Sequence, residues 1–261
     1  MRGIIKVYHG GAKLFDKWDF KKALSGEGAT MYGHGAYLAE NPKVGQSYQQ
    51  QIASKLGLED TYKGKPLTEV YDKFYGPYSS QLDLEKASVI EDLGFGKLYS
   101  EVLESVKDRY KEDPNRFNKS LLNWVEKDVS KNYKSGGYLY EMDLKHRPRD
   151  YLQHDVTLGE QSEGVKKKLK KMSDKGLFKK DIESVNPKYT FGSDIYWDLM
   201  RANDHLHAGR VKASELLSEN KIPGIRYKDQ GSRMQIDKPT YNYVVFPTDD
   251  LDIIKVKGLL Q

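Results

Sequence analysis

The chain has no cysteine among its 261 residues, and this absence excludes several kinds of chemistry at once. Without thiols there is no disulfide, no thiolate nucleophile, and no zinc or iron–sulfur site held by cysteine. A chain of this length can bury a sufficient core without covalent cross-links. The lack of cysteine is compatible with a reducing cytoplasm, although secreted proteins without cysteine also exist.

Long apolar runs are also missing. No segment approaches the roughly eighteen apolar residues of a membrane-spanning helix, so we expect no membrane partner. The start of the chain up to Lys6 lacks the apolar core of a secretory signal. An excess of one charge is absent too, because 43 Lys and Arg residues face 38 Asp and Glu residues, a net charge of +5. This balance supports a nucleic-acid partner only weakly.

The two ends of the chain favour strands, and its middle favours helices. Apolar alternation and turn residues predict strands at 5–9, 36–39, 138–144, 225–227 and 241–246. Residues 61–135 instead carry apolar residues at helical spacing, which predicts a mostly helical insertion. This segregation favours an α+β fold over alternating βαβ units, and we expect one domain over residues 1–261.

Three separated motifs carry residue types that suit a binding site. In the first, His9 stands at a strand end and is followed by Gly10. In the second, His34 lies between two glycines, and Tyr37 follows on a short strand, eleven residues before Tyr48. The third is the strand at 241–246, in which the second residue is asparagine.

Together these motifs resemble the His–Tyr–Glu class of ADP-ribosyltransferases, which includes diphtheria toxin and the poly(ADP-ribose) polymerases. A closer resemblance is to the ADP-ribosyltransferase domains of polyvalent proteins from phages and other mobile elements. Their pattern is matched in order by Gly-Glu-Gly-Ala at 26–29, Tyr-Gly-His-Gly at 32–35, Ala-Glu-Asn-Pro at 39–42, and strands at 139–143 and 224–227. The resemblance implies two small, strongly bent antiparallel sheets that form an NAD cleft.

The resemblance also implies an activity. A toxin-like mono-ADP-ribosyltransferase would move ADP-ribose from NAD, its co-substrate, to a bacterial host macromolecule and release nicotinamide. NAD glycohydrolase activity is a related expectation. A phage or mobile-element origin implies action in the host cytoplasm, reached by expression there or by delivery with a phage particle.

The resemblance assigns roles to particular residues. Tyr37 and Tyr48 would stack on the nicotinamide ring, each contact contributing about 0.5–1.5 kcal/mol beyond area burial. The backbone of Gly10 would hold the carboxamide, because a glycine permits close approach. His9 would orient the ribose through a hydrogen bond. His34 is a candidate donor toward the adenosine side.

Two positions depart from the wider class. Asn242 stands where the class has a glutamate, and Gly45 stands where the polymerases have a serine that holds the nicotinamide amide. A carboxylate would stabilise the positive charge that forms on the sugar as nicotinamide leaves. Glu27, in the glycine-rich loop, is the first candidate to supply it. We therefore expect single transfer or NAD hydrolysis rather than chain elongation.

Other interpretations stay open beside these. A catalytically silent binding or virion-associated module would explain Asn242 as the mark of lost activity. Tyr48 shares a helix face with Val44 and Ile52, so core packing is an alternative to stacking. The lysine run at 166–171 is compatible with nucleic-acid binding, but its spacing favours a solvated helix face. The histidines near 205 lack a third ligand motif, so we expect no metal site.

Overall fold

The computed structural model describes most of the chain, and its α+β class confirms the sequence-based prediction. Two predicted positions, Glu27 in the glycine-rich loop and His205, lie outside the described residues. No helix among the residues described is both long and apolar enough to cross a lipid bilayer. The described residues are 5–15, 18, 20, 32–97, 99–203, 207–229, 239–247 and 251–257.

The contacts within the chain group its residues into two compact units. The first, called the sheet unit, comprises residues 1–9, 15–45 and 141–255. The second, called the helical unit, comprises residues 10–14, 46–140 and 256–261. The helical unit contains the segment 61–135 for which the sequence predicts helices.

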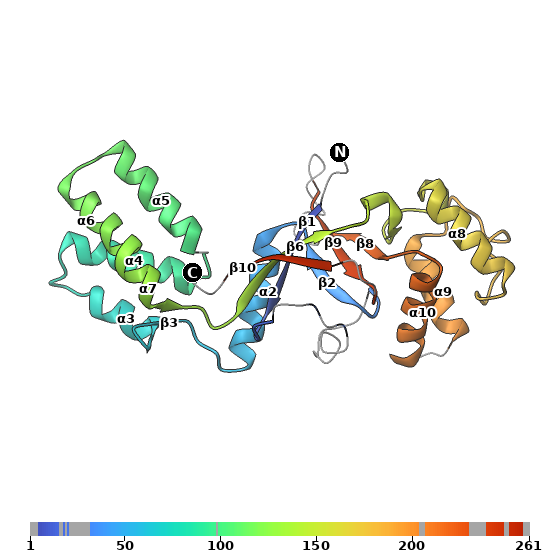
Figure 1. Ribbon diagram of the computed structural model, residues 1–261, viewed down its shortest axis with the longest axis horizontal. Helices are drawn as coiled ribbons and strands as arrows, with labels where there is room; N and C mark the ends of the chain where they lie inside the picture. The colour runs from blue at the N-terminus through green and yellow to red at the C-terminus, as the bar shows by residue number, and fades with distance from the viewer. Residues whose placement is uncertain are drawn as a thin grey trace. The chain divides into compact units, whose positions relative to one another are not determined.

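The strands of the frame form one seven-stranded sheet in the order β10-β6-β1-β2-β9-β8-β7 (Figure 1). The expectation of two small antiparallel sheets for this frame is wrong. β2 pairs with both β1 and β9, and so joins β10, β6 and β1 to β9, β8 and β7 in one sheet. β7 and β8 pair in parallel. The strands are β1 (Ile5–Gly11), β2 (Ala36–Ala39), β6 (Tyr138–Leu144), β7 (Leu152–Gln153), β8 (Gly224–Lys228), β9 (Tyr241–Val245) and β10 (Leu251–Lys257).

The core of the sheet unit forms where three helices contribute apolar residues to the same cluster as β8 and β9. α8 follows the sequence prediction closely, since Val165, Leu169 and Met172 are buried and the lysines between them are not. Ser162 begins this helix by accepting a hydrogen bond from the backbone of Val165. The helices are α8 (Glu163–Asp174), α9 (Gly192–Ala202) and α10 (His207–Glu219), with short 3-10 turns at Pro148–Asp150 and Leu158–Glu160.

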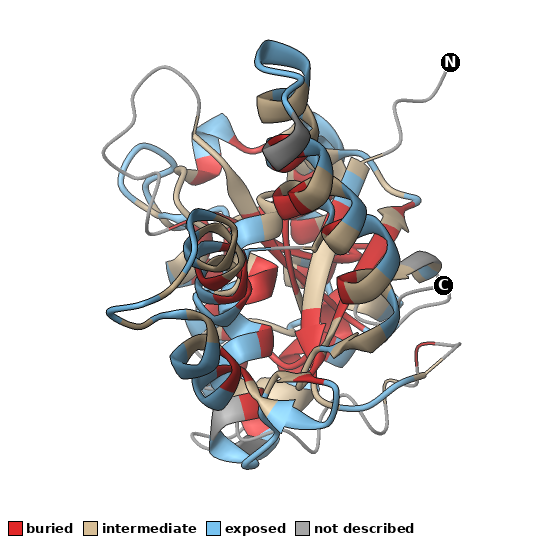
Figure 2. Ribbon diagram, turned by 90° about the vertical axis from the view of Figure 1, so that its left-hand side faces the viewer, coloured by how far each residue is buried: buried red, intermediate tan, exposed pale blue. Residues whose placement is uncertain are grey.

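The helical unit confirms the helices expected between residues 61 and 135. Its core contains Leu93, Leu121, Val125 and Val129, all fully buried. Figure 2 colours the buried residues of the protein red. Burying each such side chain contributes about 1.5–3 kcal/mol. The elements are α2 (Pro42–Lys55), which begins in the sheet unit, β3 (Thr61–Tyr62), β4 (Lys65–Pro66), α3 (Leu67–Phe74), α4 (Gln81–Gly94), α5 (Tyr99–Glu112), α6 (Arg116–Trp124), a π-helix (Val125–Val129), α7 (Ser130–Asn132) and β5 (Tyr133–Lys134).

Candidate functional site

The pairing of β2, β9 and β8 brings predicted site residues onto one face of the sheet. Tyr37 lies opposite Val244, and Asn242 lies between Ala39 on β2 and Tyr227 on β8. Side chains of directly paired residues project to the same face, as do residues two apart on a strand. Tyr37, Asn242 and Tyr227 therefore share a face of the sheet unit.

Asn242 is the polar residue at the centre of this face. It is buried, with 7% of its surface exposed, and its Oδ1 has no hydrogen-bond partner among the described residues. A buried acceptor without a donor costs about 1–3 kcal/mol of folding free energy. A hydroxyl from a bound molecule would remove this cost, so Asn242 has the properties of a ligand-binding residue.

Tyr37 fixes the end of the glycine-rich loop. Its hydroxyl donates to the carbonyl oxygen of Gly33 at 2.9 Å and accepts from the backbone N–H of Tyr32 at 3.2 Å. Its ring packs against the apolar cluster of the sheet unit. The hydroxyl is therefore committed to the loop, and a contact with a ligand would have to use the ring.

The two glycines that flank His34 are required by geometry. Gly33 has φ +127°, a backbone conformation that other residues rarely adopt. A Cβ on Gly35 would lie 2.3 Å from the carbonyl oxygen of Val245. His34 itself is buried, with 8% of its surface exposed, so it is not a solvent-exposed loop residue. Its backbone N–H donates to Ser214 Oγ at 3.0 Å, which fixes the loop to α10.

His9 contacts β2 through the main chain. Its Nδ1 lies 3.0 Å from the carbonyl oxygen of Tyr37, and a carbonyl can only accept, so the proton is assigned to Nδ1. Nε2 then carries the lone pair. Burial lowers the pKa of His9, which keeps the imidazole neutral near pH 7. Where β1 pairs with β2, Tyr8 lies opposite Ala39, so Tyr8 projects to the same face as Asn242. His9 projects to the other face, where its ring contacts the main chain of Tyr37.

The remaining predicted site residues, Gly10, Gly45 and Tyr48, are divided between the sheet unit and the helical unit. Gly45 is a buried residue of the sheet unit. Gly10, which is buried, and Tyr48, which is 50% exposed, belong to the helical unit. The core-packing alternative for Tyr48 is therefore wrong, because a side chain with half of its surface exposed is not a core residue. Its stacking role stays a prediction.

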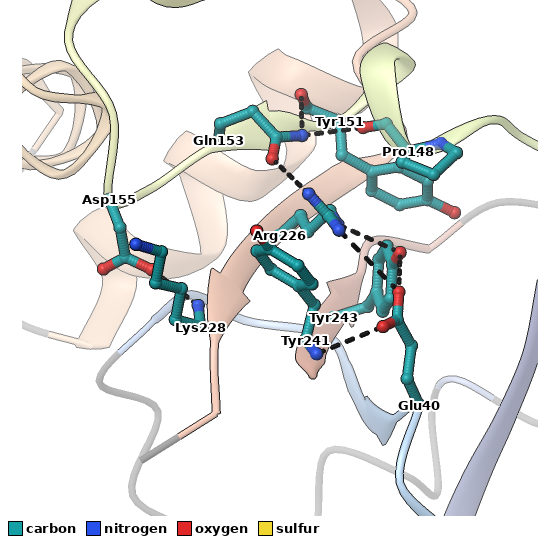
Figure 3. Close-up of polar contacts among 9 residues, drawn as sticks. All are labelled: Glu40, Pro148, Tyr151, Gln153, Asp155, Arg226, Lys228, Tyr241 and Tyr243. Atoms are coloured by element: carbon teal, nitrogen blue, oxygen red, sulfur yellow. Dashed lines mark hydrogen bonds and ion pairs between the residues drawn. The ribbon is translucent and has the colours of Figure 1, made fainter. Parts of the chain in front are cut away.

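A second polar cluster surrounds Arg226, which pairs with Tyr243 and so lies on the opposite face from Asn242 (Figure 3). The guanidinium donates to Tyr243 Oη at 3.1 Å and to Gln153 Oε1 at 2.9 Å. It also lies 3.2 Å from the centre of the Tyr241 ring. Such a planar cation, hydrogen-bonded at its edges and stacked on a ring, is well fixed.

Glu40 completes this cluster on the β2 side. Its carboxylate accepts from Tyr243 Oη at 2.7 Å and from the backbone N–H of Tyr241 at 3.2 Å (Figure 3). Burial and the Glu40 carboxylate both raise the pKa of Tyr243, which therefore stays protonated. Both oxygens of Glu40 accept hydrogen bonds that hold the sheet together, on the face opposite Asn242.

A row of rings beside Asn242 was not predicted from the sequence. Tyr32 stacks on Tyr227 with ring centres 4.0 Å apart and 7° between the planes. The edge of His154 contacts Tyr32, with centres 4.8 Å apart. Asp155 fixes His154 by lying 3.0 Å from its Nδ1 and accepts from the backbone N–H of Lys228 (Figure 3). Tyr32 and Tyr227 belong to the motifs at 32–35 and 224–227, but only the tertiary structure brings their rings together with His154.

The lysines of α8 serve the helix surface, as the spacing predicts. Lys168 donates to the carbonyl oxygen of Lys221 at 2.6 Å, and Lys170 pairs with Glu183 at 2.6 Å. Lys166 pairs with Glu163, one turn away. These contacts are those of a solvated helix face rather than of a prepared anion site.

Comparisons with protein-family models, with curated protein sequences and with solved structures find no match to this chain. The interpretation of the site therefore depends on the order of its sequence motifs and on the chemistry of the residues themselves.

Proposed function

We propose that this chain has the ADP-ribosyltransferase fold, binds NAD and transfers single ADP-ribose units to a macromolecule of a bacterial host. The observation that carries the proposal is the buried, unpartnered Oδ1 of Asn242, on the same sheet face as Tyr37. The order of the motifs supports the same assignment. In the reaction, the bond between C1′ of the ribose and the nicotinamide nitrogen breaks, and its electron pair leaves with nicotinamide. A bond from C1′ to an acceptor atom forms, and the acceptor proton passes to water.

Each residue has a role in this proposal. Asn242 Oδ1 accepts a hydrogen bond from a ribose hydroxyl and so fixes the sugar. The neutral His9, on the opposite face from Asn242, holds the main chain of Tyr37 through Nδ1 and so positions β2, while its contact with the ribose stays a prediction. Tyr37 stacks on nicotinamide through its ring. Gly33 and Gly35 let the chain pass close to β9 beside the dinucleotide.

The absence of a charge at Asn242 sets the expected rate. An amide cannot stabilise the cationic sugar as a carboxylate does, so we expect slow transfer or hydrolysis. A catalytically silent module is the second candidate. Glu40 favours it, because its carboxylate binds Tyr243 and Tyr241 on the face opposite Asn242 and so does not lie beside the sugar. Glu27 stays the first residue to test as a replacement.

The test measures binding and turnover separately. Calorimetry determines whether NAD binds, and chromatography follows nicotinamide release with and without host lysate. Labelled NAD identifies the acceptor. We expect binding, slow release, and a labelled band that is reduced in Asn242→Ala and unchanged in Tyr78→Ala, a substitution of a 99% exposed side chain. Binding with no release under any condition would favour the silent module, and no binding of NAD at all would refute both.

A further inference from the structure

The sheet unit contains a pocket that none of the site residues described above lines. It has a volume of about 440 Å³ and lies between α9 and the segment 178–190. This volume falls within the range of about 300–1,000 Å³ that is usual for small-molecule sites. Ile182, Val185 and Ile195 give the pocket an apolar lining. Asn242, Tyr37 and His9 are not among its lining residues, so it is separate from the proposed NAD site.

An aromatic ring with cations beside it stands at this pocket. Trp197 lines the pocket, and 36% of its surface is exposed. The guanidinium of Arg201 lies 5.9 Å from the centre of the indole, and that of Arg210 lies 6.0 Å from it. An indole at a pocket wall offers a surface on which a planar ligand can stack.

The carboxylates and the cations of the pocket differ in their contacts with the protein. Both of its carboxylates are held by the protein main chain, since Asp194 accepts from Phe191 N at 2.8 Å and Asp198 accepts from Lys179 N and Lys180 N at 2.9 and 3.1 Å. In contrast, the side chains of Lys180 and Arg201 form no ion pair within the described part of the chain. These two cations are available to a bound anion.

We propose that this pocket binds a nucleotide, with the base stacked on Trp197 and the phosphate beside Arg201 and Lys180. The nucleotide is either free or part of a single-stranded nucleic acid. Two further exposed aromatic residues, Tyr189 at 76% and Phe191 at 43%, follow the pocket along the same segment. Exposed rings next to cations are what sequence-tolerant binding of single strands requires. The inference does not depend on the proposed NAD chemistry.

The experiment uses the full chain and two probes. AMP binding is followed by calorimetry, and binding of a fluorescent oligodeoxyadenylate is followed by anisotropy at several salt concentrations. Trp197→Ala should weaken binding of the probe about tenfold or more, as expected for losing a base stack. Arg201→Gln should weaken it and reduce its salt dependence, because one phosphate contact is lost. Arg149→Gln removes the same charge from an exposed residue outside the pocket and should change neither value.

The outcomes separate the sources of the ligand and can overturn the proposal. Binding of AMP as tight as that of the oligonucleotide identifies a free nucleotide, whereas a much tighter oligonucleotide identifies a strand. The proposal is wrong if neither probe binds, or if Trp197→Ala binds both as the wild type does while keeping its thermal transition. If NAD displaces AMP from the wild type but not from Asn242→Ala, the AMP is bound in the NAD site. That result would refute a separate nucleotide pocket.

Discussion

The hydroxyl of Tyr37 donates a hydrogen bond to the carbonyl oxygen of Gly33, 2.9 Å away, and so holds the glycine-rich loop against the strand that follows it. The same oxygen accepts from Tyr32 N, and Tyr32 in turn stacks on Tyr227. One phenol thus links the loop to β2 and, through Tyr32, to β8. The stability of the loop should therefore depend on a single oxygen atom.

Tyr37→Phe should reduce the free energy of unfolding by about 1–3 kcal/mol, because the carbonyl of Gly33 and the N–H of Tyr32 each lose a partner. The ring is retained, so a stacked ligand should lose little affinity. Urea denaturation and NAD calorimetry measure the two effects. Tyr138→Phe removes a hydroxyl that has no hydrogen-bond partner among the residues that the structure describes, and serves as the control, with an expected change under about 0.5 kcal/mol. Equal stability of the two variants would contradict the proposed link.

Substitutions of Asn242 should separate folding from function. Asn242→Ala removes the buried Oδ1 that lacks a donor, so stability should change by less than about 1 kcal/mol. Nicotinamide release should nevertheless fall about tenfold or more, since the ribose loses a hydrogen bond. Asn242→Glu should raise NAD hydrolysis if the pocket accepts the longer side chain. A large loss of stability together with unchanged turnover in Asn242→Ala would show that the amide is structural.

The stability of the protein should fall on mild acidification because of His9. Burial lowers the pKa of His9 below its ordinary value of 6.5, so the unfolded chain binds the proton more readily. The unfolded state therefore gains protons first as the pH falls, and stability is lost from about pH 6.5 downward until the folded-state pKa is passed. His9→Gln should show a smaller difference in unfolding free energy between about pH 8 and about pH 5. Identical pH profiles for wild type and variant would refute a buried neutral His9.

The Arg226 cluster should be a major source of stability for the sheet. Its guanidinium, 17% exposed, bonds residues of β7 and β9. Arg226→Gln should cost about 2–4 kcal/mol, because hydrogen bonds to charged groups contribute about 1.5–3 kcal/mol each. Denaturant unfolding tests this against Arg149→Gln, an exposed control. A cost of only a few tenths of a kcal/mol would mean that solvent replaces these bonds.

Gly35→Ala should be poorly tolerated. Its new Cβ would lie 2.3 Å from the carbonyl oxygen of Val245, so β2 and β9 would have to separate. Gly176 has φ +69° and open space around it, and Gly176→Ala should cost only about 1 kcal/mol of backbone strain. A thermal unfolding series should place Gly35→Ala well below Gly176→Ala. The reverse order would show that the close approach of the two strands is not required.

Local patterns were enough to predict much of the fold. The spacing of Val165, Leu169 and Met172 indicated the buried side of α8, and the helices between residues 61 and 135 follow from the same period. Such patterns indicate which side of a helix or strand is buried, because that side is set by the spacing of apolar residues within one short segment. They do not report which strands pair, and two small sheets were accordingly expected where the strands of the frame form a single seven-stranded sheet, beside a three-stranded sheet of β4, β3 and β5.

The sequence by itself determined the class of fold and identified Asn242 and the glycines around His34 as notable positions, whereas the tertiary structure decided that a side chain at position 35 would meet the carbonyl oxygen of Val245. Only the tertiary structure decided that Tyr37 uses its hydroxyl on Gly33 and that His9 turns its Nδ1 to a carbonyl oxygen. It alone placed the ring of His154 beside Tyr32, and it alone surrounded Arg226 with residues from three other segments. The physical reason is that hydrogen bonds and ring contacts between distant residues depend on strand register, and register is set by the packing of the whole sheet rather than by any short stretch of chain.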